Sequence, residues 1–193
     1  DHRHAFAARQ DAAMTQDPRP AHIAIVTVSD RAARGEYPDK GGPGAEAWLR
    51  ATITSAMQIS RIIIPDGRES VADTLHALCD AQGADLILIT GGTGPAPRDL
   101  TPEAMADVME KELPGFGEEM RRASLREVPT AILSRQTAGI RGRTLMITIP
   151  GKPSAIATCL DAVFAAVPYC LDLIGAARIE TDPARITAFR PKT

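Results

Sequence analysis

The sequence has only three cysteines in 193 residues, and their spacing is not that of a metal site. Cys79, Cys159 and Cys170 lie in apolar patterns typical of helices, whereas zinc-binding cysteines come in close pairs. An odd number also does not suit a closed disulfide framework. We therefore expect three buried thiols in a reducing, cytoplasmic environment.

Basic runs, long apolar runs and a signal-peptide core are also absent from the sequence. A nucleic-acid partner needs a positively charged face, and the net charge of -2 without a basic run argues against one. No apolar segment approaches the length of a membrane span, and the first residues lack the apolar core of a signal peptide. These absences predict a soluble protein with no nucleic-acid and no membrane partner.

The length of 193 residues suits one domain with a substantial core. Residues 1–21 are polar and rich in alanine, and we expect a flexible extension there. Residues 22–177 carry the regular apolar patterns and are predicted to form the domain. Residues 178–193 have one small apolar cluster, Ile186 and Phe189, and are expected to be a loosely packed tail.

The stretch that we predict to carry the chemistry is residues 90–103, TGGTGPAPRDLTPE. It follows an aliphatic run at residues 85–89 that is typical of a strand covered on both faces. Thr101 suits the N-cap of a following helix, and Pro102 suits its first position. The loop therefore lies at the carboxyl end of a predicted parallel strand, where open α/β sheets bind ligands.

Three glycines in this loop, Gly91, Gly92 and Gly94, let a ligand approach the main-chain amides closely. Because the next helix adds the positive end of its dipole, phosphate is the expected ligand. Asp99 would repel phosphate unless a divalent cation lay between them, which predicts magnesium beside Asp99.

Two better-known phosphate motifs do not fit these loops. Pro97 stands where a dinucleotide fingerprint needs its third glycine, and Pro153 stands where a Walker loop needs Ser or Thr. A glycine-rich connection that binds no ligand remains the alternative for residues 90–103.

The remaining pattern alternates predicted strands with predicted helices. The expected strands are residues 22–29, 60–65, 85–89 and 143–149, with short extended pieces at 128–135 and 136–142. The expected helices are residues 45–57, 70–82, 102–111, 116–125 and 156–174, the last kinked or divided by Pro168. This order predicts an α/β fold, a three-layer sandwich around a mostly parallel sheet.

Three further loops reach the same predicted edge of the sheet. Residues 32–44 are glycine-rich and long enough for a lid or a binding loop. Asp66 follows the second strand and could approach Asp99, although Asp before Gly is commonly a turn former. In residues 150–154, PGKPS, Lys152 offers a charge to phosphate and Ser154 a helix cap, and capping alone is the alternative.

Several motifs, taken together, resemble a known family. They are residues 28–31 (VSDR), 90–94 (TGGTG), 98–103 (RDLTPE), 113–118 (LPGFGE), 129–135 (PTAILSR) and 150–154 (PGKPS). In order and spacing they resemble the MogA/MoaB family of molybdenum-cofactor biosynthesis, most closely its MogA branch, the molybdopterin adenylyltransferases. The resemblance runs from about residue 22 to residue 192 and so covers nearly the whole chain.

The resemblance implies a homotrimer that binds molybdopterin and Mg²⁺-ATP, forms adenylyl-molybdopterin and releases pyrophosphate. It also implies that Asp66 and Asp99 are catalytic and face the Mg²⁺. The ligand-binding residues that it implies are Ser29, Asp30, Gly91, Gly92, Thr93, Gly94, Thr101, Ser134, Arg135, Pro150, Gly151, Lys152, Pro153 and Ser154. Some members have an extra hairpin after the Pro-Gly loop, whereas here the connection to the last helix is direct.

Two other activities remain open at this stage. A MoaB-like carrier would bind molybdopterin without adenylylating it, because a shared fold does not separate binding from turnover. A molybdate-inserting enzyme of the MoeA type would need additional domains, for which we expect this chain to be too short. An enzyme of that type is instead a candidate partner that would receive the product.

Overall fold

The structure is a computed structural model that describes residues 19–192. Most of the expected N-terminal extension, residues 1–18, lies outside the described residues. The elements along the chain are β1 (Ala21–Val28), α2 (Asp30–Ala33), α3 (Gly41–Thr52), β2 (Met57–Ile64), α4 (Arg68–His76), η1 (Ala77–Ala81), β3 (Leu86–Thr90), α5 (Thr101–Val108), β4 (Lys111–Glu112), α6 (Pro114–Leu125), η2 (Pro129–Leu133), β5 (Ala138–Arg141), β6 (Thr144–Ile149), α7 (Pro153–Val163), η3 (Phe164–Ala166) and α8 (Val167–Leu173).

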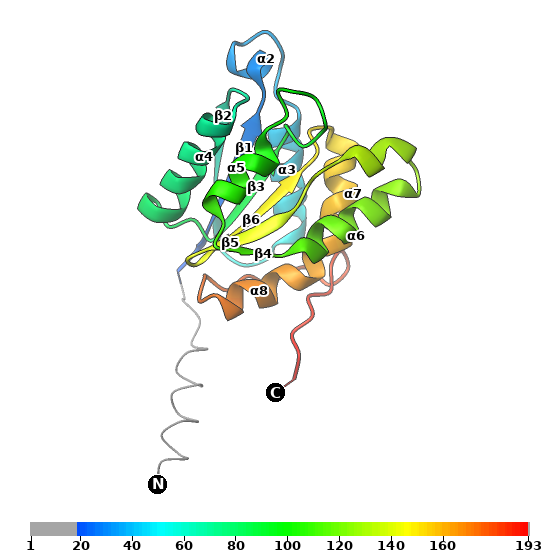
Figure 1. Cartoon of the computed structure of the whole chain (residues 1–193). Helices are drawn as coiled ribbons and strands as arrows, with labels where there is room; N and C mark the ends of the chain where they lie inside the picture. The colour runs from blue at the N-terminus through cyan, green and yellow to red at the C-terminus, as the bar shows by residue number, and fades with distance from the viewer. Residues whose placement is uncertain (1–18, 193) are drawn as a thin grey trace.

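The strands form a six-stranded sheet in the order β2-β1-β3-β6-β5-β4 (Figure 1). β2, β1, β3 and β6 are parallel, while β5 and β4 join antiparallel at one side of the sheet. The prediction of an α/β fold around a mostly parallel sheet is therefore confirmed. Because β1, β2, β3 and β6 point the same way, the loops that follow them meet at one edge of the sheet.

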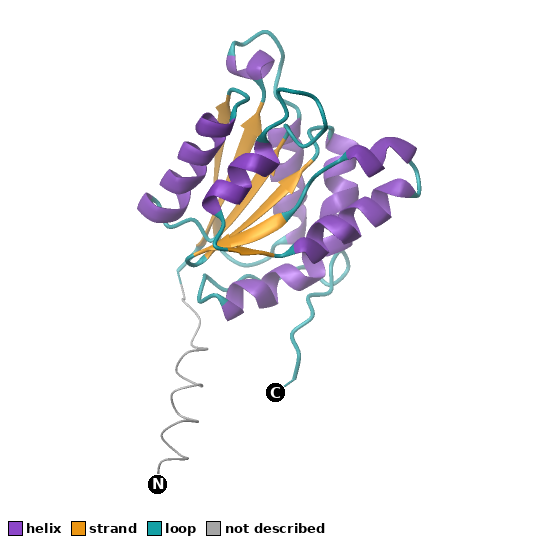
Figure 2. Cartoon of the chain, in the orientation of Figure 1, coloured by secondary structure: helices purple, strands orange, loops and turns teal. Residues whose placement is uncertain are grey.

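Helices cover both faces of the sheet and bury two separate cores (Figure 2). Side chains alternate along β1, so that Ile23 and Ile25 pack with α3 and α7 while Ala24 and Val26 pack with α4 and α5. A strand with both faces covered needs apolar residues at every position, which explains the continuous aliphatic runs in the sequence.

Several element boundaries differ from the expectation. α3 begins at Gly41 rather than Ala45, because the Asp39 carboxylate accepts hydrogen bonds from the Gly42 amide and the Thr27 hydroxyl, both at 3.0 Å, and so fixes the helix start before the glycines. Residues 129–133 form a 3-10 helix rather than an extended segment, and the Ala131 amide donates a hydrogen bond to the Val128 carbonyl. The expected helix at 102–111 ends at Val108, and residues 111–112 pair with β5.

The C-terminal segment is packed rather than loose, contrary to our expectation. Ile179 and Ile186 are buried in the core, and the Phe189 amide donates to the Ala165 carbonyl at 3.0 Å. Arg190 also bonds the carboxylate of Asp172, at 2.6 Å. Several polar and apolar contacts therefore hold residues 178–192 against α8 and the sheet.

The stretch Pro153–Leu173 is long and apolar enough to cross a membrane by length and composition, with a mean hydropathy of 1.6. This differs from our expectation that no apolar segment approaches that length. The stretch is divided into α7, η3 and α8, and its residues Ile156, Leu160 and Phe164 pack into the core beside the sheet. Its apolar character is thus that expected of a helix facing a protein core.

All three cysteines are free, but only Cys159 is buried, whereas Cys79 and Cys170 are half-buried. Burial raises the pKa of each thiol above its usual value, and that of Cys170 to about 11. A raised pKa keeps a thiol protonated and unreactive near neutral pH. The expectation of three buried thiols therefore holds for Cys159 and is wrong for Cys79 and Cys170, which are only half-buried.

The opposite, amino-terminal edge of the sheet is fixed by Asp85. Its carboxylate accepts two hydrogen bonds of 2.7 Å from Arg19, one of 2.8 Å from the His22 amide and one of 3.0 Å from the Ala177 amide. Burial alone would raise the pKa of Asp85, but these bonds and the Arg19 charge together lower it below 3.8. Asp85 thereby joins β1, β3 and the segment after α8.

Candidate functional site

A cavity of about 340 Å³, which we call the edge cavity, opens at the carboxyl edge of the sheet. Figure 1 shows this edge of the sheet as the one nearest α2. The loops after β1, β3 and β6 all contribute to its lining. The predicted site residues among its lining are Ser29, Gly91, Gly151, Lys152 and Pro153, and residues that sequence reasoning did not single out include Tyr37, Asp39 and Lys40.

The glycine-rich loop has the unusual backbone that its sequence predicts. Gly91 and Gly92 have φ angles of 100° and 68°, in the region that favours glycine. A Cβ at Gly91 would collide with the carbonyl oxygen of Val28, and one at Gly92 with the hydroxyl of Thr101. Close packing against β1 and α5 therefore requires glycine at both positions, whether or not a ligand binds there.

Thr101 holds this loop against the start of α5. Its hydroxyl donates to the Gly91 carbonyl at 2.9 Å, and its amide donates to the Gly92 carbonyl at 3.1 Å. The Thr101 side chain is buried and lines neither the edge cavity nor any other described cavity. Thr101 thus positions the loop, and its predicted contact with a ligand finds no support in this placement.

Arg135 holds the other half of the same loop. Its Nε donates to the Gly94 carbonyl at 3.0 Å, its Nη2 donates to the Asp99 carbonyl at 2.7 Å, and its Nη1 pairs with the Glu103 carboxylate. The Arg135 amide also donates to the Thr93 carbonyl at 2.7 Å. The hydrogen bond from Arg135 lowers the pKa of Glu103, partly opposed by burial. All three nitrogens of this guanidinium are thus engaged with the protein itself.

The structure pairs Asp66 with Asp30 rather than with Asp99. One carboxylate oxygen of Asp66 accepts the Asp30 amide at 3.0 Å, and one of Asp30 accepts the Asp66 amide at 2.9 Å. Asp99 instead accepts the Ala96 amide of its own loop at 3.0 Å. No hydrogen bond or ion pair joins Asp66 to Asp99 within residues 19–192. Because β1 lies between β2 and β3, the two loops are separated by roughly 10 Å at the strand ends.

The loop at residues 32–44 borders the edge cavity, in the position that a lid or binding loop would need. The ring of Tyr37 lies beneath two cations: its centre is 5.2 Å from the Arg31 guanidinium carbon and 6.0 Å from the Lys40 amine nitrogen. At Gly41 a Cβ would lie 3.0 Å from the Gly151 carbonyl, so the loops after β1 and β6 are in close contact there. Lys40 and Lys152 bring two positive charges to the cavity wall.

A second cavity, of about 280 Å³, lies between the end of α6, η2 and the start of α7. We call it the Gln136 cavity. Among the predicted site residues, Ser134, Pro150, Lys152 and Ser154 line it, so Lys152 borders both cavities. Gln136 lines it as well, and sequence reasoning missed this residue because nothing in its motif marks a buried amide. Ser134 and Gln136 also border a further cavity, of about 450 Å³, together with Arg135. The predicted residues therefore do not share one cavity, and seven of them line none of the three: Asp30, Asp66, Gly92, Thr93, Gly94, Asp99 and Thr101.

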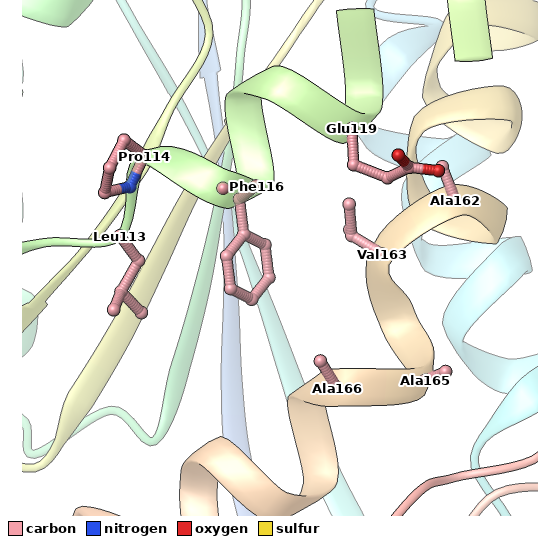
Figure 3. Close-up of a pocket in the computed structure, with 9 residues that line it drawn as sticks. Leu113, Pro114, Phe116, Glu119, Ala162, Val163, Ala165 and Ala166 are labelled. Carbon is pink, nitrogen blue, oxygen red and sulfur yellow. The ribbon is translucent and has the colours of Figure 1, made fainter. Parts of the chain in front are cut away.

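A fourth cavity, of about 430 Å³, is mostly apolar and lies apart from these loops. Figure 3 shows Leu113 and Phe116, at the start of α6, facing Val163 and Ala166 at the α7–η3 junction. Glu119 is its single charged lining residue. No predicted site residue lines this cavity, so its size alone does not make it the functional site.

Comparison with known proteins identifies the family. Residues 24–169 match the family model described as "Probable molybdopterin binding domain". The molybdopterin adenylyltransferase of Helicobacter pylori (strain J99) is 48% identical over 171 residues, which cover 89% of this chain and 97% of that protein. The chain belongs to the MogA/MoaB family.

Solved structures of the MogA/MoaB family have the same fold. The molybdopterin biosynthesis enzyme MoaB from Thermus thermophilus is 39% identical with a TM-score of 0.73, over 80% of this chain and 96% of that one. The molybdopterin biosynthesis Mog protein from Mycobacterium ulcerans is 36% identical with a TM-score of 0.74, over 80% and 99%. Both branches of the family match equally well in shape, so the fold alone does not separate them.

Proposed function

We propose that this protein is a molybdopterin adenylyltransferase, which transfers AMP from ATP to molybdopterin. The observation that carries the proposal is the edge cavity at the carboxyl end of the parallel strands, whose wall brings Lys40 and Lys152 beside the glycine-rich loop. Glycine amides and lysine amines are groups that bind phosphate oxygens. The 48% identity to a protein named for this activity favours the adenylyltransferase over the carrier.

In this reaction an oxygen of the terminal phosphate of molybdopterin attacks the α-phosphorus of ATP. A new P–O bond forms while the bond from the α-phosphorus to the bridging oxygen breaks, and pyrophosphate leaves with that electron pair. The protein need not form a covalent bond, so its contribution is positioning and charge neutralisation. The lysines of the edge cavity and the amide of Gly92 would neutralise the negative charge on the phosphates, whereas the Gly91 amide already donates to the Ile149 carbonyl at 3.1 Å.

Asp66 and Asp99 are the carboxylates that we propose to face Mg²⁺. In each, one oxygen accepts a main-chain amide and the other has no protein partner among residues 19–192. Such free carboxylate oxygens suit Mg²⁺, which prefers oxygen ligands and keeps several waters and phosphate oxygens of its own. No group of three acidic, His or Cys side chains is placed for a metal in the described chain, so phosphate would have to complete this coordination. When bound, Mg²⁺ would neutralise charge on the triphosphate.

Asp99→Ala tests the proposal directly. We expect kcat/KM for adenylylation of molybdopterin to fall on the order of a hundredfold or more, as for other lost charge-stabilising groups. Asp73→Ala, which removes an exposed carboxylate from α4, is the matched control and should leave the rate unchanged. A near-normal rate for the Asp99 variant would remove this residue from the mechanism.

The carrier alternative differs in one product. An adenylyltransferase releases pyrophosphate from ATP when molybdopterin is added, whereas a MoaB-like carrier binds molybdopterin and leaves ATP intact. A coupled pyrophosphate assay on the wild-type protein separates these two activities.

We also propose a cytoplasmic homotrimer that passes its product to a MoeA-type enzyme. Large apolar side chains are exposed along the end of α6 and η2, including Leu125, Val128, Ile132 and Leu133, as at a surface that another subunit covers. The molar mass in solution, measured by light scattering, checks the assembly.

A further inference from the structure

Gln136 has a buried polar atom that the protein leaves without a partner. Its side chain is 1% exposed, and its Nε2 lies 3.9 Å from the Cys159 sulfur, a weak contact. Its Oε1 has no hydrogen-bond partner within residues 19–192. Exchanging the two amide atoms would only transfer the deficit from the oxygen to the nitrogen. Because an unpaired buried amide destabilises a fold, its retention calls for an explanation.

Ser134 has the same deficit and lies two residues away. Its buried hydroxyl and the Gln136 Oε1 are the two buried side-chain polar atoms without a partner in the described part of the chain. Ser134 has an extended backbone, so residues 134 and 136 present their side chains to the same side. Both residues line the Gln136 cavity, which is also lined by Ser154 and Thr158.

The main chain between these residues is rigidly held. Arg121 donates from Nη1 to the carbonyl oxygens of Ser134 and Gln136, at 3.3 and 2.8 Å. The intervening residue, Arg135, turns to the opposite side and holds the glycine-rich loop. The main chain that carries the two unpaired atoms is therefore fixed, so that only a turn of the two side chains is needed for them to meet a ligand in the cavity.

We propose that Gln136 recognises the ring of a nitrogen heterocycle in the Gln136 cavity, with its Oε1 accepting a hydrogen bond from a ring N–H. The Ser134 hydroxyl, which both donates and accepts, pairs with the neighbouring polar atom of the ring. The occupant that we assign is the pterin of molybdopterin, and this assignment depends on the proposed function.

Two features favour a pterin over the adenine of ATP. A pterin offers N–H groups beside a carbonyl on one edge, which satisfies both a carbonyl acceptor and a hydroxyl, whereas adenine offers one amino group beside bare ring nitrogens. The volume of about 280 Å³ also suits a bicyclic ring better than a whole nucleotide. Lys152 borders both cavities, so the phosphate of the pterin ligand would meet the triphosphate next to it.

Gln136→Met tests the proposal, because methionine keeps the length of the side chain and removes both polar atoms. We expect the affinity for 6-hydroxymethylpterin, measured by fluorescence quenching, and 1/KM for molybdopterin to fall about tenfold or more. The Kd of Mg²⁺-ATP should not change. The melting temperature should stay the same or rise, because an unpaired buried group is lost. A purely structural glutamine would give a lower melting temperature instead.

Three results would overturn the proposal. A loss of ATP affinity with normal pterin affinity would make adenine the occupant. Unchanged binding of both ligands would mean that water satisfies the amide. A lower melting temperature with equal loss of both affinities would make Gln136 structural. Gln58→Met, on the exposed side of β2, is the control and should alter none of these quantities.

Ser134→Ala gives an independent test should the Gln136 variant fold poorly, because it removes one hydroxyl and adds no volume. We expect pterin affinity to fall about threefold to tenfold with ATP affinity unchanged, and a normal pterin affinity would overturn the assigned pairing. These binding measurements do not require turnover. If wild-type protein binds both ligands but releases no pyrophosphate, the proposed adenylylation fails while the role of Gln136 is still decided.

Discussion

Removing the Arg135 guanidinium should loosen the glycine-rich loop without touching any residue of the edge cavity. Arg135 holds the Gly94 and Asp99 carbonyls and the Glu103 carboxylate with three different nitrogens. Arg135→Ala removes all of these bonds. Arg135→Lys keeps the charge, but a lysine amine has no planar fork and cannot reach three separated acceptors at once.

We expect Arg135→Ala to cause only a modest loss of stability, because Arg135 and Glu103 are partly exposed to solvent. A net hydrogen bond from a charged donor contributes about 1.5–3 kcal/mol when buried. The side chains of Arg135 and Glu103 are 39% and 32% exposed, so water replaces part of what is lost. We expect Arg135→Ala to lower the free energy of unfolding by about 1–2 kcal/mol, and the melting temperature by roughly 3–6 °C.

The expected loss of activity is larger than the loss of stability. The main chain from Gly94 to Asp99 carries the proposed magnesium carboxylate, and a shift of about 1 Å in a catalytic group costs about a hundredfold in rate. We expect kcat for adenylylation to fall about tenfold to a hundredfold in Arg135→Ala and by less in Arg135→Lys. Arg122→Ala, which removes an exposed arginine paired with Glu119 on α6, is the matched control. Wild-type kcat and melting temperature in the Arg135→Ala protein would refute this role.

The stability difference should also depend on pH with a definite sign. The bond to Arg135 lowers the pKa of Glu103 below 4.5. A lowered carboxyl pKa contributes stability above the unfolded-state value and loses it as pH falls through the folded-state value. The gap in melting temperature between wild type and Arg135→Ala should therefore be complete at pH 6 and narrow below about pH 4.

Two further predictions concern the two edges of the sheet. Gly91→Ala should lower the free energy of unfolding by about 3 kcal/mol or more, because alanine adds a clash with the Val28 carbonyl to the strain of a positive φ. Gly35 has a φ of 72° and open space around it, so Gly35→Ala should lower the free energy of unfolding by about 1 kcal/mol. Equal urea midpoints for the two variants would contradict the clash at Gly91. Asp85→Asn should cost about 2–4 kcal/mol at pH 7, because it weakens a buried carboxylate that accepts from Arg19 and two amides. The lowered pKa of Asp85 means that wild type loses this advantage progressively as the pH falls below about 3.8, so a gap in urea midpoint that does not narrow below that pH would contradict the assignment.

The sequence predicted the fold well where one physical cause dominates. β1 and β3 are buried on both faces, so an unbroken aliphatic run identifies them without knowledge of their neighbours. The positive φ angles of Gly91 and Gly92 likewise follow from glycine at the end of a strand. Such features depend on a few adjacent residues, and the same residues are visible in the sequence.

Features that depend on distant residues could not be predicted in this way. Arg135 was expected to bind a ligand, but its partners lie 32 to 41 positions earlier in the chain, and only the fold brings them together. Asp66 was expected near Asp99, yet the strand order places β1 and its Asp30 between them. The start of α3 depends on Asp39 and Thr27, twelve residues apart. In each case the sequence motif identifies the residue, but its hydrogen-bond partner is determined by tertiary packing.

Groups that destabilise the fold are found at the carboxyl edge of the sheet rather than throughout the structure. Two carboxylates, Asp30 and Asp66, are held together, and Ser134 and Gln136 each keep an unpaired side-chain atom. At the amino-terminal edge, by contrast, both carboxylate oxygens of Asp85 accept hydrogen bonds. A cation would relieve the repulsion between the two carboxylates, and a polar ring would pair with the unpaired side-chain atoms. A fold that leaves these groups unsatisfied only where cavities open is therefore better explained by ligand binding than by incomplete packing.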